Sequence, residues 1–302
     1  MLIDSLILIV GMFGLGLISR RLSLLPDNAA DTLNRLVLQI CLPALVFQAV
    51  TRLQWELSLL ALVLVAWALG GLGWAWAVVL SRRFGWSRGV EGCLALTLML
   101  GNTAFLGYPM VQGLLGKPAL AAAVVYDQLG TFILLSVGGL SAVAIYSGAP
   151  RPNPLSVFRR VVSSPAFIAL MLALLPLPHP IWLGTFLDRV ASLLVPLALF
   201  AVGLSFHVVP PREELPPLLV GLLLKMLISP LLAWLLLSAV GADRLVLAAG
   251  VLQAAMPAMV TAGALAIQHQ LAPRLAAALV GYGVLIGLAW LPLLAWVLGP
   301  VG

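Results

Sequence analysis

The stretch GNTAFLGYPM, residues 101–110, lies inside a long apolar run yet contains two glycines, a proline and an Asn-Thr pair. Pro109 has no N–H, and its ring clashes with the carbonyl group four residues earlier, while Gly101 and Gly107 tolerate backbone angles that other residues resist. A helix is therefore predicted to break here. The backbone groups that the break frees are costly against lipid, so they must face protein, water or a ligand.

The composition places this break inside a membrane protein. Of the 302 residues, 63% are hydrophobic and 9% are charged, whereas a soluble domain has roughly half and roughly one quarter. Repeated apolar runs reach the roughly 20 residues that a helix needs to cross a bilayer, which predicts an all-α polytopic membrane protein instead of a barrel. The net charge of +6 comes from short basic clusters beside these runs, so no nucleic-acid partner is expected. Cys41 and Cys93 lie apart from any Cys/His cluster, and no metal site or cofactor is expected.

Polar clusters and Pro/Gly signals divide the chain into ten predicted spans, at about 3–19, 33–51, 57–80, 90–114, 118–147, 163–183, 187–208, 214–240, 243–267 and 273–299. Eleven arginines flank one side of these spans and four basic residues the other: Arg20, Arg21, Arg35, Arg82, Arg83, Arg88, Arg151, Arg159, Arg160, Arg212 and Arg274, against Arg52, Lys117, Arg189 and Arg244. The arginine-rich side is predicted to be cytoplasmic, which puts both termini on the non-cytoplasmic side of the inner (plasma) membrane.

The two halves of the chain are similar to each other. PALAAAVVYDQLG, which begins at residue 118, aligns with PRLAAALVGYGVL, which begins at residue 273. Prolines also correspond between the halves: Pro43 with Pro196, and Pro109 with Pro257. Because each half has an odd number of spans, the second must cross the membrane in the opposite direction. Such inverted repeats are typical of secondary transporters, whose substrate binds near the midplane where discontinuous helices meet.

The predicted division is a first repeat over 1–147, a cytoplasmic linker over 148–162 and a second repeat over 163–302. In the linker, PLSVFRRVV predicts a short amphipathic helix on the cytoplasmic leaflet.

The two breaks are predicted to form a small polar chamber at mid-depth. Half-helix N-termini carry unsatisfied N–H groups and a partial positive charge, which suit a carboxylate. Asn102 and Thr103 add donors and acceptors beside the first break. Gln253 lies four residues before Pro257, so its carbonyl is expected to be the one that this proline frees. The alternative is a pair of proline kinks that only shape the helix bundle.

Several motifs resemble those of the auxin efflux carrier family. GNTAFLGYPMVQGLLG resembles its fourth-helix motif, AGVLQAAMPAMVTAGALA its ninth, LKMLISPLLA its eighth, and VVYDQLGT the fifth helix of its bacterial members. The resemblance spreads over nearly the whole chain. It implies ten transmembrane helices in two inverted five-helix repeats with broken, crossing helices 4 and 9, similar to bile-acid sodium symporters and sodium/proton antiporters. It also implies a scaffold domain from helices 1, 2, 6 and 7 and a transport domain from helices 3–5 and 8–10.

The chain departs from the plant members of that family in its central loop. Plant auxin exporters have a long cytoplasmic loop between the fifth and sixth helices, whereas only about SGAPRPNPLSVFRRVV stands there in this chain. The similarity is therefore to the compact bacterial form, which includes carriers of malonate- and malate-like dicarboxylates. Auxin itself is not expected to be the physiological substrate.

Three polar residues deep in spans are predicted to form an ion-coupling site or a charge network: Asp127, Gln128 and Lys225. Intramembrane charges are costly and are functional candidates by default. Asp127 is the first candidate for a proton or cation site. Lys225 is expected to stabilise a partner carboxylate, replace a coupling cation or hold broken-helix carbonyls. The alternatives are a structural pairing of Asp127 with Lys225 and a lysine that snorkels to the interface.

The predicted function is a secondary transporter that moves a small organic anion, an auxin-like carboxylate or a dicarboxylate, by an elevator-type shift of one domain. Without paired intramembrane aspartates or an HExxH motif, no catalytic residue and no enzyme activity are assigned. The alternatives are a passive anion channel and a sodium-coupled bile-acid-type symporter. The sequence leaves substrate, direction, proton or sodium coupling and a homodimer open. The predicted substrate-binding residues are Asn102, Thr103, Gly107, Pro109, Gln253 and Pro257, with Pro43 and Pro196 shaping the facing scaffold.

Overall fold

The computed structural model describes residues 2–26, 28–51, 57–150, 152–175, 180–206 and 214–299. Over these ranges the chain forms helices and one isolated β-bridge, with no strand. The all-α prediction is therefore confirmed. Arg52, Arg151 and Arg212, three of the charges that predicted the orientation, lie outside the described residues.

The helices of the first half are α1 (Leu2–Arg21), α2 (Ala29–Leu36), α3 (Leu42–Thr51), α4 (Leu57–Phe84), α5 (Arg88–Met99), α6 (Gly107–Leu115), α7 (Leu120–Val125), α8 (Phe132–Leu134) and α9 (Leu140–Ser147). Those of the second half are α10 (Pro154–Val162), α11 (Pro165–Ala173), α12 (Ile181–Ser192), α13 (Leu194–Ser205), α14 (Leu215–Leu223), α15 (Ser229–Ala239), α16 (Arg244–Ala254), α17 (Val260–Gln268) and α18 (Pro273–Leu298). A 3₁₀ turn, η2 (Lys117–Ala119), precedes α7. Wider π-helical turns join other consecutive helices: η1 (Val37–Cys41), η3 (Tyr126–Thr131), η4 (Leu135–Gly139) and η5 (Leu224–Ile228).

Six helical segments of the described chain are long and apolar enough to cross a membrane: Ala29–Thr51, Ser58–Phe84, Lys117–Ser147, Ile181–Ser205, Leu215–Ala239 and Pro273–Leu298. A seventh is counted if α10 and α11, which meet at an angle of 63°, form one span. This confirms a polytopic helical membrane protein. Ten spans in two inverted repeats stay a prediction.

One predicted boundary is wrong. The connection expected between the sixth and seventh spans, near residues 183–187, lies inside α12, and α11 already ends at Ala173. Arg189, which was counted among the flanking charges, is an exposed side chain of this helix. The apolar residues of α12 continue the helical pattern, and its one glycine, Gly184, does not end the helix.

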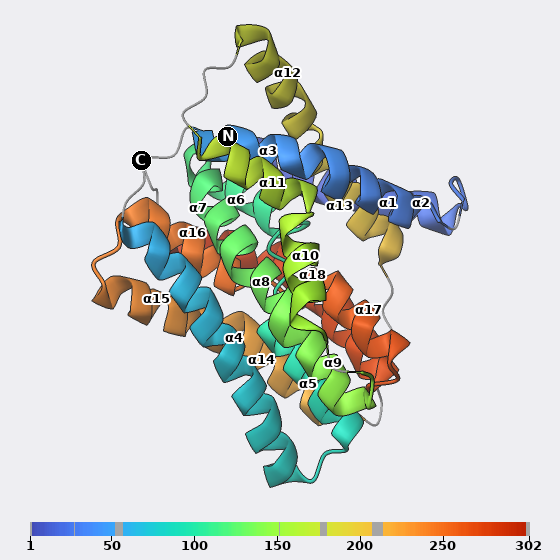
Figure 1. The fold of residues 1–302 in the computed structure, drawn as a ribbon. Helices are drawn as coiled ribbons and strands as arrows, with labels where there is room; N and C mark the ends of the chain where they lie inside the picture. Colours follow the sequence, from blue (N-terminus) through green and yellow to red (C-terminus); the bar gives the residue numbers. More distant parts are fainter. Residues whose placement is uncertain are drawn as a thin grey trace.

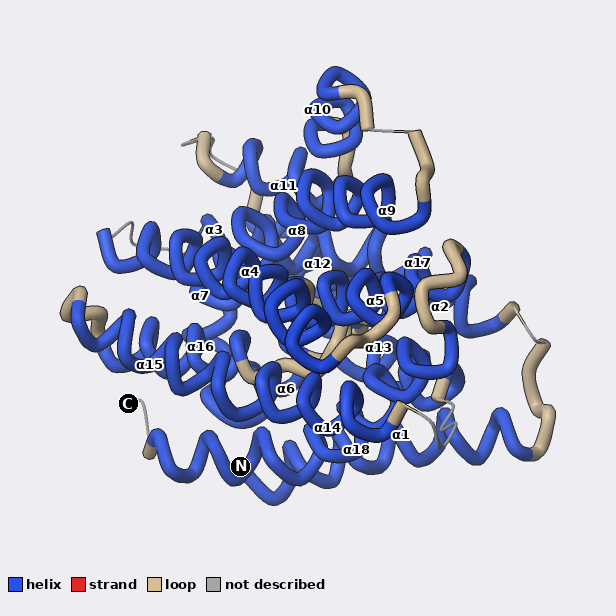
Figure 2. Tube along the Cα trace, turned by 90° about the horizontal axis from the view of Figure 1, so that it is seen from below, coloured by secondary structure: helices blue, strands red, loops and turns tan. Residues whose placement is uncertain are grey.

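The helices pack in two groups (Figure 1). The first group contains α1, α2, α3, α11, α12 and α13: α1 packs against α13, and α11 and α12 pack against α3. The second group contains α4–α9 and α14–α18, with α4 against α5, α15 against α16 and α17 against α18. The groups meet where α1 and α13 contact α6 and where α3 contacts α7. Figure 2 shows α10 at the periphery, beyond α9 and α11.

The contact between α1 and α13 depends on two glycines. A Cβ atom on Gly16 would overlap the carbonyl oxygen of Phe200, and one on Gly203 would overlap that of Phe13. Small residues that let two backbones approach closely are a common basis of helix packing in membranes, where the hydrophobic effect between helices is weak.

Candidate functional site

The first unwound segment, residues 100–106, separates α5 from α6. Gly107, Tyr108 and Pro109 form the first turn of α6. A proline is tolerated there because the first N–H groups of a helix have no intrahelical acceptor. Pro109 therefore begins a second half-helix instead of kinking a continuous one.

The second unwound segment, residues 255–259, separates α16 from α17 and contains Pro257. The prediction that Pro257 frees the carbonyl of Gln253 is wrong, because the N–H of Met256 donates to this carbonyl at 3.3 Å. At the end of α16 the hydrogen bond joins residues three apart, Met256 and Gln253, as in a 3₁₀ turn. The carbonyl of Gln253 is therefore already bonded and does not depend on an N–H group at position 257. It is the side chain of Gln253, instead of its backbone, that extends to the first segment.

The two unwound segments pair with each other, and together they are called the crossing below. The N–H of Asn102 donates to the carbonyl of Pro257 at 2.8 Å, and the N–H of Met259 donates to that of Leu100 at 2.9 Å, around one antiparallel bridge. Each segment therefore satisfies part of the backbone that the other exposes. A ligand at the crossing would meet mainly side chains and helix termini.

Two amides at the crossing keep polar atoms without partners. The side chain of Asn102 is 1% exposed, and neither its Oδ1 nor its Nδ2 has a hydrogen-bond partner within the described chain. Oε1 of Gln253 is likewise buried without a partner, while its Nε2 donates to the carbonyls of Thr103 and Ala123, each at 3.2 Å. Each unsatisfied buried polar group costs about 1–3 kcal/mol, so these atoms are places where a ligand could supply the missing hydrogen bonds.

Gly107 permits the close approach of α6 and α16. A Cβ atom on this residue would overlap Oε1 of Gln253. The glycine is therefore needed for packing at the crossing, in addition to any backbone freedom that it provides.

Asp127 is joined directly to the first unwound segment. It lies in η3, is 4% exposed, and accepts hydrogen bonds from Thr103 Oγ1 at 2.5 Å, Tyr108 OH at 2.6 Å and Gln128 Nε2 at 2.7 Å. Oε1 of Gln128 is buried without a partner among the described residues. The carboxylate thus ties the fifth predicted span to the start of α6 through neutral donors.

Lys225 approaches the other end of the same segment. It lies in η5, is 8% exposed, and its Nζ donates to the carbonyl of Leu98 at 3.1 Å. Leu98 is in the last turn of α5, where carbonyls lack intrahelical donors and the helix dipole favours a positive charge. The structural pairing with Asp127 is wrong: no ion pair joins these two residues, both of which the structure describes.

Pro43 and Pro196 lie on the first group of helices, in the first turns of α3 and α13. α3 packs against α7, and α13 packs against α6. The two prolines are half-buried. They therefore belong to the helices that face the crossing, while the amides and Asp127 belong to the second group.

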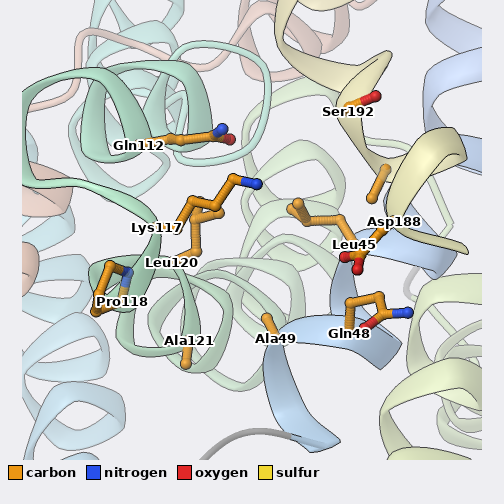
Figure 3. A pocket seen from close by; sticks show the side chains of 11 residues that line it. Leu45, Gln48, Ala49, Gln112, Lys117, Pro118, Leu120, Ala121, Asp188 and Ser192 are labelled. Carbon is orange, nitrogen blue, oxygen red and sulfur yellow. The ribbon is translucent and has the colours of Figure 1, made fainter. Parts of the chain in front are cut away.

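A cavity of about 570 Å³, called the polar cavity below, opens between the two groups (Figure 3). None of the predicted site residues lines it. In the sequence Lys117 is visible only as a loop charge, and Gln112 was not predicted, although a lone glutamine in the apolar stretch GYPMVQGLL was a signal. The lining residues are Leu45, Gln48, Ala49, Gln112, Lys117, Pro118, Leu120, Ala121, Asp188, Ala191 and Ser192.

A second cavity, of about 320 Å³, lies between α13, α17 and the start of α18 and is called the apolar cavity. It reaches Val260, the first residue of α17, and therefore the edge of the crossing. Its lining residues are Val202, Ser205, Phe206, Val260, Gly263, Ala264, Ile267, Ala276, Ala277, Val280, Gly281 and Val284.

Comparisons with known proteins agree with this architecture. A family model described as "Membrane transport protein" matches residues 1–144 and 155–296. An "Uncharacterized transporter" of Methanothermobacter thermautotrophicus is 29% identical over 290 residues, covering 94% of each chain. The "Uncharacterized transporter MJ1031" of Methanocaldococcus jannaschii is 27% identical over 213 residues, covering 67% of this chain and 68% of its own.

Proposed function

Because the chain belongs to the membrane transport protein family, the auxin efflux carrier-like family that its motifs predicted, we propose that it is a secondary transporter of a small organic carboxylate. The observation that carries this proposal is the buried side chain of Asn102 at the crossing, whose Nδ2 and Oδ1 have no partner among the described residues. The amide nitrogen of an asparagine can donate hydrogen bonds to a carboxylate without adding a charge of its own. The free Oε1 of Gln253 is an acceptor, which suits a hydroxyl or N–H group of the same substrate.

The two half-helix N-termini at the crossing differ in what they offer an anion. In the first turn of α6, the N–H of Gly107 donates to the carbonyl of Asn102 at 2.9 Å and that of Tyr108 donates to Ala104 at 3.3 Å. Pro109 has no N–H. The N-terminus of α6 therefore has few donors left.

The N-terminus of α17 is open. Its first helical bond runs from the N–H of Gly263 to the carbonyl of Met259, so the N–H groups of residues 260–262 have no intrahelical acceptor. Thr261 is exposed. We propose that the carboxylate lies between this N-terminus and Asn102, where the helix dipole favours a negative charge.

The apolar cavity supports a substrate with an apolar body. It begins at Val260, beside the proposed carboxylate position, and none of the described residues that line it is charged. A second carboxylate in this space would lose its hydration without a partner. Among the predicted substrates, the cavity therefore favours an aromatic or aliphatic monocarboxylate over a dicarboxylate.

The proposed topology has ten spans in two inverted repeats. Six of these spans are the long apolar segments named above. The other four are α1, α11, the broken pair α5 with α6 and the broken pair α16 with α17. The first group of helices would be the scaffold domain and the second the transport domain, which moves by an elevator-like shift. The arginine-rich ends would face the cytoplasm of the inner membrane, so the polar cavity would open outside and the apolar cavity inside.

Lys225 and Asp127 are proposed to set the ion dependence. The ammonium group of Lys225 donates to the carbonyl of Leu98 and supplies the positive charge that a bound cation would supply there. Transport is therefore expected not to require sodium. Asp127 holds Thr103 and Tyr108 of the broken span. Protonation of this carboxylate would weaken those bonds, which makes Asp127 the proposed proton site.

The function is tested by uptake of labelled malonate, malate and indole-3-acetate into proteoliposomes under separately imposed pH, sodium and voltage gradients. Saturable, counterflow-competent uptake of a carboxylate without sodium dependence is expected, and indole-3-acetate should serve as the better probe. An Asp127→Asn variant should lose the response to a pH gradient. Channel-like flux, or no uptake of any carboxylate, contradicts the proposed function, and an unchanged pH response in Asp127→Asn contradicts the proton site.

A further inference from the structure

The polar cavity has free hydrogen-bonding capacity on one wall only. Figure 3 shows Gln112, Lys117, Leu120 and Ala121 on the wall formed by the second group of helices, with the Lys117 ammonium pointing into the cavity. Neither the ammonium of Lys117 nor the amide of Gln112 has a hydrogen-bond or ion-pair partner in the part of the chain that the structure describes.

The groups on the opposite wall are already engaged. Nε2 of Gln48 donates to the carbonyl of Gly184 at 2.8 Å. Asp188 also has an interaction partner. The donors that remain for a ligand are therefore those of a cation and an amide, and this combination suits an anion.

The repeat offers an internal comparison for these residues. Pro118 aligns with Pro273, and the same spacing aligns Gln112 with Ile267 and Ala121 with Ala276. Ile267 and Ala276 line the apolar cavity. Corresponding stretches of the two repeats thus line both cavities.

The same spacing aligns Lys117 with Ala272 of the second repeat. Ile267 lines the apolar cavity where its counterpart Gln112 lines the polar cavity, so packing at this position does not require a glutamine. Ala272 does not line the apolar cavity, so Lys117 has no counterpart in that lining. Both differences point to a role of Gln112 and Lys117 in binding.

We propose that Lys117 and Gln112 form an anion-recruitment site in the polar cavity, which binds the substrate carboxylate before it reaches the crossing; this rests on the proposed function. The route from one to the other is short. Ala121 lines the cavity, and two residues on, the carbonyl of Ala123 accepts a hydrogen bond from Gln253. Asp127 is about 9 Å further along the same helix axis than Ala121. The apolar cavity has no such site, so the two faces of the transporter differ in their capture of an anion.

The site is tested by cysteine labelling at the cavity wall. The two native cysteines, Cys41 and Cys93, are 1% and 0% exposed and provide the unreactive background. In an Ala121→Cys variant in detergent, an anionic methanethiosulfonate reagent should react faster than a cationic one, and indole-3-acetate or malonate should protect the thiol.

Adding Lys117→Gln should reduce the anionic-to-cationic rate ratio about 30-fold. Unit charges about 4 Å apart in water interact by about 1 kcal/mol, or about fivefold in rate, and loss of the charge slows the anionic reagent and speeds the cationic one. The same change should abolish protection. Lys117→Arg should keep both. Arg189→Gln is the matched control, since Arg189 is a basic residue of the same α12 that contributes Asp188 but does not line the cavity. Protection should persist in Asn102→Ala, which alters the crossing and leaves the cavity intact.

Protection that is absent, or that survives Lys117→Gln, overturns this site. The outcome is separable from that of the proposed function. Carboxylate transport without protection of the thiol contradicts only the recruitment site. Protection without transport of any carboxylate contradicts only the transporter.

Discussion

At the scale of single residues, the two unwound segments pair through their backbones, and the side chains of Asn102 and Gln253 keep free buried polar atoms there. The sequence predicted that Asn102, Thr103 and Gln253 belong together, and the structure brings them together through the bond from Gln253 Nε2 to the Thr103 carbonyl. The sequence could not show whether the backbone carbonyl or the side chain of Gln253 faces the first unwound segment, because this depends on how α16 ends. The contact partners of Asp127 and Lys225 could not be predicted either. The position of a residue along its helix does not tell which end of a neighbouring segment its side chain contacts.

Gly107 should tolerate no side chain. In Gly107→Ala, the new Cβ would overlap Gln253 Oε1, so the crossing must open at a cost of about 1–3 kcal/mol. We expect a lower melting temperature in detergent and the loss of carboxylate uptake.

Gly71→Ala is the matched control, because nothing lies within 4 Å of its added Cβ and Gly71 is in the helix α4. It should be neutral or slightly stabilising, since alanine is favoured over glycine in a helix by roughly 0.5–1 kcal/mol. Equal stability and uptake in the two variants would show that Gly107 has no packing role.

At the scale of elements, the helix bounds follow the apolar runs closely, but the π-helical turns have no visible signal in the sequence. Asp127 and Gln128 lie in η3 and Lys225 lies in η5. Each π turn inserts a residue and rotates the side chains that follow, and such turns are frequent at functional sites. A uniform helical periodicity therefore misplaces these three side chains around their helices even when their depth is predicted well.

The pairing of α1 with α13 gives a prediction at this scale. In Gly203→Val, the added side chain would overlap the carbonyl of Phe13 and push the helices apart, with a loss of about 3 kcal/mol. Gly14→Val, on the partner helix α1 and with nothing within 4 Å of its added Cβ, should change the melting temperature little. Similar thermal unfolding of the two variants in detergent would contradict the close packing.

At the scale of the whole molecule, composition and apolar runs were enough to predict an all-α polytopic membrane protein, and the motifs were enough to predict the family. The two cavities were not predictable. They lie between helices far apart in sequence, and their volumes depend on how the two groups of helices are placed against each other. Gln112 and Lys117 can be recognised as cavity-lining residues only when the positions of α3 and α12 on the opposite wall are known.

The sidedness of the cavities gives a prediction for the whole molecule. Ala121→Cys lines the polar cavity and Ala277→Cys lines the apolar cavity. In right-side-out vesicles, a membrane-impermeant thiol reagent should block transport by Ala121→Cys, because a filled cavity cannot close. The same reagent should block Ala277→Cys only in inside-out vesicles. The reverse pattern would contradict the proposed orientation.

The proposed site depends most on Asn102, whose buried amide nitrogen has no partner among the described residues and is proposed to donate to the carboxylate. The most direct measurement is equilibrium binding of labelled indole-3-acetate to the purified protein in detergent, with Asn102→Ala and, as a control, Asn34→Ala on the distant α2. Because neither polar atom of the Asn102 side chain has a partner among the described residues, its removal should leave the melting temperature unchanged or slightly raised. We expect saturable binding that Asn34→Ala retains and Asn102→Ala loses. Undiminished affinity in a well-folded Asn102→Ala variant would contradict it.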